Sequence, residues 1–64
     1  MLQLSVIIPV LQEQQRINRT VAAVRRQAPR AEIIVVDGDP AGSTLHVLTD
    51  PSVIQLTATA GRGN

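Results

Sequence analysis

The sequence predicts an α/β fold in which three parallel strands alternate with two helices. Three observations support this prediction. Short apolar segments rich in β-branched residues occupy positions 4–10, 32–37 and 53–57, and each has the length of a strand. A longer segment with helical periodicity separates the first two. Strands that alternate with helices are typical of a parallel sheet, here half of a doubly wound domain.

The first strand and the first helix follow from the residue pattern. Residues 4–10 read LSVIIPV, and we expect Pro9 to end the strand. The polar residues 12–16 then open a helix, and Pro29 stops it. Apolar residues recur inside this helix at helical spacing and form one stripe, which consists of Ile17, Val21, Val24 and Ala28.

The remaining elements complete a β-α-β-α-β order. Residues 32–37 are apolar on both faces, as in a buried parallel strand. A loop at 38–42 leads to a short helix that we expect over 43–49, and residues 53–57 form a weaker third strand. Because β-α-β crossovers are right-handed, the predicted strand order is 3-2-1 with both helices on one face.

The composition excludes several kinds of site. The chain has no Cys and one His, which excludes disulfides, thiolate sites and His-based zinc sites. All six basic residues are Arg, and five lie in or just after the predicted helix, either as a solvated face or as a phosphate patch. No aromatic residue is present for base stacking, so we expect no nucleic-acid partner. The first apolar segment is too short to span a membrane and has no basic leader, which favours a cytoplasmic chain.

The first strand would lie at an edge of this sheet although it is apolar on both faces. Natural edge strands are usually blunted by charge. The sheet face opposite the helices would also have no cover. We therefore expect residues 1–64 to form a single partial domain, completed by a missing C-terminal part or by self-association.

Polar segments follow the predicted strands at their carboxyl ends, where open parallel sheets bind ligands. These segments are 9–13, 37–39 and 61–63. A carboxylate here can accept hydrogen bonds from a base or ribose, and an Arg among glycines can pair with a diphosphate. Simpler roles stay open, because Asp37 could cap the next helix and Glu13 could pair with Arg16 at a helix N-terminus. The first strand is followed by no G-x-G-x-x-G, and the chain has no P-loop.

Taken together, the blocks LSVIIPVLQE (4–13), AEIIVVDG (31–38) and GRGN (61–64) resemble, in the same order, three blocks of family 2 glycosyltransferases. The resemblance implies a Rossmann-like GT-A fold and a nucleotide-sugar donor of UDP or GDP type. It implies that Pro9 and Glu13 line the base pocket, that Asp37 contacts the base, and that Asp39 lies near the ribose. It also implies that Arg62 approaches the donor phosphates.

The chain departs from the family pattern in three ways. Gln12 replaces the usual Asn, and residues 39–43 replace the usual S-T-D-G loop. The D-x-D metal motif and the catalytic base are not among the 64 residues. We therefore expect donor binding without sugar transfer, no catalytic residue, no metal ligand and no cofactor in this segment, with Mg²⁺ or Mn²⁺ needed by the full-length family. The alternative is a non-catalytic α/β module that self-associates and binds no ligand.

Overall fold

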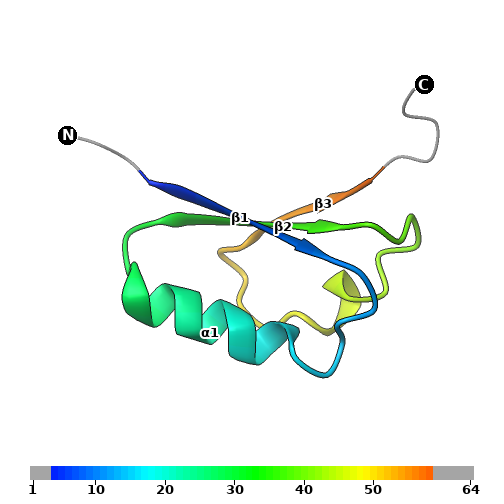
Figure 1. Ribbon diagram of the computed structural model, residues 1–64, viewed down its shortest axis with the longest axis horizontal. Helices are drawn as coiled ribbons and strands as arrows, with labels where there is room; N and C mark the ends of the chain where they lie inside the picture. The colour runs from blue at the N-terminus through cyan, green and yellow to red at the C-terminus, as the bar shows by residue number, and fades with distance from the viewer. Residues whose placement is uncertain (1–3, 59–64) are drawn as a thin grey trace.

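A three-stranded parallel sheet with one α-helix on one of its faces forms the structure (Figure 1). The computed structural model describes residues 4–58. The strands are β1 (Ser5–Val10), β2 (Glu32–Asp37) and β3 (Ile54–Thr57); the helices are α1 (Ile17–Gln27) and the 3-10 helix η1 (Leu45–Val47). The strand order is β1-β2-β3, with β2 in the middle. The predicted fold class and strand order are thereby confirmed.

The core lies between the sheet and α1. Ile33 and Val35 of β2 are fully buried, and alternation along the strand directs both toward the helix. From the predicted apolar stripe, Ile17 and Val21 are buried against them. Each such aliphatic side chain contributes about 1.5–3 kcal/mol by leaving water. The complete core cluster is Val10, Ile17, Val21, Ile33, Val35, Leu45 and Val53.

The second predicted helix is shorter than expected and of a different type. Only Leu45–Val47 is helical, as one 3-10 turn, and Leu48 is already extended at φ −64° and ψ 134°. The side chain of Asn18 explains this end. Its Nδ2 donates to the Val47 carbonyl at 2.7 Å, and its Oδ1 accepts the Thr49 N–H at 2.9 Å. These backbone groups are therefore bonded to α1 rather than to a continuing helix.

Two boundaries near the N-terminus also differ from the predicted ones. β1 continues past Pro9 to Val10, because an edge strand tolerates a residue without an N–H. The helix begins at Ile17 rather than within 12–16, since residues 14–16 form a turn. Within residues 4–58, no helix is both long and apolar enough to cross a membrane.

The sheet face opposite α1 is apolar and is covered by no element among residues 4–58. We call it the open face. Ile7 on this face is 63% exposed and Leu56 is 50% exposed. The strand register places its members in rows across the sheet, with Ile7 beside Ile34 and Ile34 beside Ile54. The apolar members of the open face are Ile7, Pro9, Ile34, Val36, Ile54 and Leu56.

Candidate functional site

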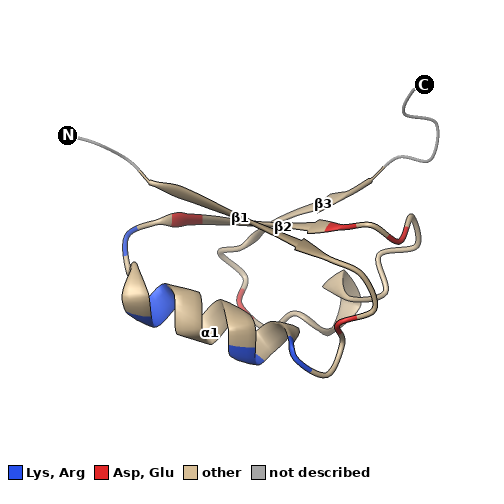
Figure 2. Ribbon diagram, in the orientation of Figure 1, with Lys and Arg blue, Asp and Glu red and all other residues tan. Residues whose placement is uncertain are grey.

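The loops after β1 and β2 lie side by side at the carboxyl end of the sheet. Val10, the last residue of β1, is in register with Asp37, the last residue of β2, and the Gly38 N–H donates to the Val10 carbonyl at 2.8 Å. Figure 2 shows acidic residues at both ends of β2 and in the loop that follows it. This end of the sheet carries the predicted residues Pro9, Glu13, Asp37 and Asp39. The fifth, Arg62, lies outside the described residues.

Asp37 organises the loop that follows β2. Its side chain is fully buried, its Oδ1 accepts the Asp39 N–H at 2.9 Å, and its Oδ2 accepts the Thr44 N–H at 2.9 Å. These two bonds fold the loop back toward the strand end. Asp37 does not cap η1, because the N-cap residue of η1 is Thr44 and this helix has no side-chain cap hydrogen bond. Each carboxylate oxygen can accept a further hydrogen bond, but the side chain is fully buried. Contact of Asp37 with a base therefore stays a prediction.

Asp39 holds the same loop from the solvent side. Its Oδ1 accepts the Ala41 N–H at 3.0 Å, and its Oδ2 accepts a hydrogen bond from the Ser43 hydroxyl. The Ser43 hydroxyl, followed by the Ala41 N–H, lowers the pKa of Asp39, because both stabilise the charged form. Gly42 completes the loop with φ +69°, a conformation that favours glycine. The predicted position of Asp39 near a ribose stays a prediction.

Thr44 joins the two strand-end loops and was not among the predicted site residues. It is fully buried, and its Oγ1 accepts the N–H of Glu13 at 3.0 Å. Its own N–H is bonded to Asp37, so one residue connects Glu13 to the end of β2. Sequence reasoning could have singled out Thr44 by its place near the start of the short helix predicted over 43–49.

Glu13 connects the end of β1 to the start of α1. Its carbonyl accepts the N–H groups of Arg16 and Ile17, each at 2.9 Å. Its carboxylate pairs with Arg16 at 3.5 Å (Glu13 Oε1 to Arg16 Nε), which confirms the predicted ion pair. The preceding Gln12 has φ +55°, in the left-handed region. A shallow hollow of about 390 Å³ opens here, lined by residues 12–16.

Pro9 shares the strand end with these residues but lies on the other side of the sheet. It is in register with Val36, whereas Asp37 is in register with Val10. Since side chains alternate along a strand, the Pro9 ring lies on the open face and the Asp37 carboxylate on the α1 face. The structure therefore brings Glu13, Asp37 and Asp39 together and leaves the Pro9 ring apart.

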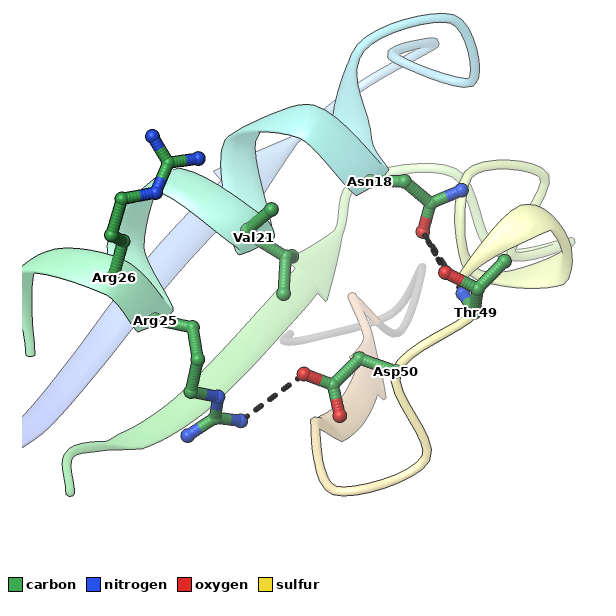
Figure 3. Close-up of a pocket in the computed structure, with 7 residues that line it drawn as sticks. Asn18, Val21, Arg25, Arg26, Thr49 and Asp50 are labelled. Atoms are coloured by element: carbon green, nitrogen blue, oxygen red, sulfur yellow. Dashed lines mark hydrogen bonds and ion pairs between the residues drawn. The ribbon is translucent and has the colours of Figure 1, made fainter. Parts of the chain in front are cut away.

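A second groove of about 410 Å³ lies between α1 and the segment before β3 (Figure 3). Asn18, Arg25, Thr49 and Asp50 in its lining are engaged in hydrogen bonds. Arg25 donates to the Ala31 carbonyl at 3.0 Å, to Ser52 Oγ at 2.7 Å and to Asp50 Oδ2 at 3.3 Å. The hydroxyl and N–H of Ser52, followed by Arg25, lower the pKa of Asp50. These contacts clamp α1 to the chain before β3, which is a structural role.

The acidic and His side chains among residues 4–58 form no metal-binding cluster. Among residues 4–58, no three side chains of His, Cys, Asp or Glu come together in a way that could hold a metal ion. The buried side-chain oxygen and nitrogen atoms of these residues all have hydrogen-bond partners. The carboxylates of Asp37 and Asp39 accept hydrogen bonds from backbone N–H groups and from the Ser43 hydroxyl.

Residues 5–54 match the family model described as Glycosyl transferase family 2. The chain belongs to glycosyl transferase family 2. The predicted family is thereby confirmed, and the match includes the β1 and β2 loops of this family 2 chain but ends before Arg62. No curated protein and no solved structure gave a significant match.

Proposed function

We propose that the strand-end loops of this family 2 chain bind the nucleotide of a UDP- or GDP-type sugar donor, as the N-terminal part of a glycosyltransferase. The observation that carries the proposal is that both loops fall inside the family match and meet at the carboxyl edge of a parallel sheet. This is where such sheets bind ligands. The family relationship supplies the ligand class.

The proposed roles follow the positions of the residues. Asp37 accepts from the base, for which its carboxylate, fully buried in the structure, has to become accessible. Asp39 accepts from a ribose hydroxyl through its ionised carboxylate. Glu13 borders the base pocket beside the hollow at 12–16. Pro9 belongs to the site through its backbone at the end of β1. Arg62 pairs with the donor diphosphate.

Nucleotide binding can be tested by thermal unfolding of the 64-residue chain with UDP, GDP or AMP. A ligand at ten times its Kd stabilises the folded state by about 1.4 kcal/mol. In a domain of this size, that raises Tm by roughly 6–10 °C. The proposal expects this rise with UDP or GDP and a smaller one with AMP. An unchanged Tm with both UDP and GDP at millimolar concentration contradicts it.

The proposal assigns donor binding, and no sugar transfer, to these residues. A metal ion normally balances the charge of a diphosphate leaving group. Incubation of the purified chain with UDP- and GDP-sugars and Mn²⁺ should therefore release no free nucleotide above the rate without protein. Turnover that scales with the concentration of the chain refutes this part.

The proposed location is the cytoplasm, which a fluorescent fusion would check.

A second candidate function rests on the open face. Ile7 and Leu56 expose large apolar surfaces there, and such surfaces are common at protein interfaces. In this alternative, the chain is a non-catalytic module that self-associates and binds no ligand. This alternative expects a stable dimer in size-exclusion chromatography and a Tm that UDP and GDP leave unchanged. The dimer should be lost in Ile7→Glu and kept in the control variant Arg26→Glu on α1. A monomer at micromolar concentration contradicts it.

A further inference from the structure

Thr44 lies where the loop after β1, the loop after β2 and the start of η1 meet. Its side chain is fully buried, although Thr is a residue type more often found at the surface. It lies 31 positions from Glu13 and 7 from Asp37 along the chain, yet it is hydrogen bonded to both. It accepts from the Glu13 N–H through Oγ1 at 3.0 Å and donates its own N–H to Asp37 Oδ2 at 2.9 Å.

The loop after β1 needs such an anchor. Gln12 has φ +55°, a conformation that costs free energy for a residue with a side chain. The next peptide is fixed at both of its polar groups: the Glu13 N–H by Thr44, and the Glu13 carbonyl by the first N–H groups of the helical segment. The hydroxyl of Thr44 thus sets the orientation of the backbone that carries Glu13.

We infer that Thr44 is a positioning residue of the nucleotide site, acting through Glu13 and Asp37 without touching the ligand. The inference rests on the proposed function. Valine has nearly the shape of threonine but lacks the accepting oxygen, so Thr44→Val removes the bond to Glu13 and keeps the bond to Asp37. Thr44→Ser keeps both bonds and loses one methyl group.

Two measurements on wild type, Thr44→Val and Thr44→Ser test the inference. The first is hydrogen exchange of the Glu13 amide by NMR, with the Val35 amide in the core as reference. The second is the Kd for UDP and GDP by calorimetry. In Thr44→Val, loss of one hydrogen bond should raise the exchange rate of the Glu13 amide relative to that of Val35 by about tenfold. The Kd for the nucleotide should also rise by about tenfold. Thr44→Ser should stay within about threefold of wild type in both, since its hydroxyl remains.

The outcomes separate this inference from the proposed function. Unprotected Glu13 exchange in the wild type overturns the inference without any variant. Equal exchange and equal Kd in Thr44→Val and wild type also overturn it, as does a failure of Thr44→Ser to restore protection. If the wild type binds neither UDP nor GDP while Glu13 exchange follows the expected pattern, the proposed function fails and the positioning of the loop by Thr44 is upheld.

Discussion

Replacement of Asp37 by Ala removes the group that accepts two backbone N–H bonds at the end of β2. Thr44 is fully buried, so water cannot take the place of the carboxylate as acceptor for its N–H. The Asp39 N–H is half-buried, so water can partly replace the carboxylate there. A hydrogen bond to a charged group contributes about 1.5–3 kcal/mol, and a buried unpaired donor costs about 1–3 kcal/mol. Counting the Thr44 bond in full and the Asp39 bond in part gives a loss of about 3 kcal/mol.

That loss is large for a chain of 64 residues, whose free energy of unfolding should be about 3–10 kcal/mol. Urea unfolding of wild type, Asp37→Ala, Asp37→Asn and Asp39→Asn measures it. Asp37→Asn keeps one accepting oxygen and should lose about half as much. Asp39→Asn should lose clearly less than Asp37→Ala, because water reaches its loop. If Asp37→Ala costs no more than Asp39→Asn, Asp37 does not organise the loop as described.

Three further predictions concern the rest of the described chain. Gln12→Asn should raise the free energy of unfolding by about 0.5 kcal/mol in urea titrations, since Asn tolerates positive φ better, and Gln12→Val should lower it. Arg25→Ala should lower Tm by several degrees through loss of its contacts to the segment before β3, whereas Arg26→Ala should change Tm little. Because the folded-state pKa values of Asp39 and Asp50 are lowered, the stability they contribute is complete above about pH 4 and is lost as pH falls through the folded values. Melting curves from pH 7 to pH 2.5 should therefore show Tm falling below pH 4, and less steeply in a double Asp39→Asn, Asp50→Asn variant.

The sequence predicted the sheet well because its strands depend on local pattern. The β2 bounds were predicted as observed, since a short β-branched run between a Pro-containing turn and a Gly-rich loop has few alternatives. The segment over 43–49 was harder. Its conformation depends on Asn18, which lies far away in the sequence and takes up backbone groups of Val47 and Thr49. No local propensity contains that information.

The candidate site was predictable in location but not in detail. Because β1 and β2 are parallel neighbours, Glu13 and Asp37 both lie at the carboxyl end of the sheet. The buried bond between Thr44 and Glu13 joins residues far apart in sequence, and it becomes visible only when the strands are paired. The side of the sheet on which Pro9 lies also depends on register, because a shift of one residue would move its ring to the other face.

A nucleotide titration followed by NMR tests the central claim most directly. The ¹⁵N-labelled chain is titrated with UDP and with GDP while amide chemical shifts are recorded. If the strand-end loops bind the nucleotide, the amides of Glu13, Gly38 and Asp39 should move in a saturable way, and those of Arg25 and Ser52 should stay still. No saturable shift with either nucleotide, or shifts confined to the groove beside Asp50, would contradict the account.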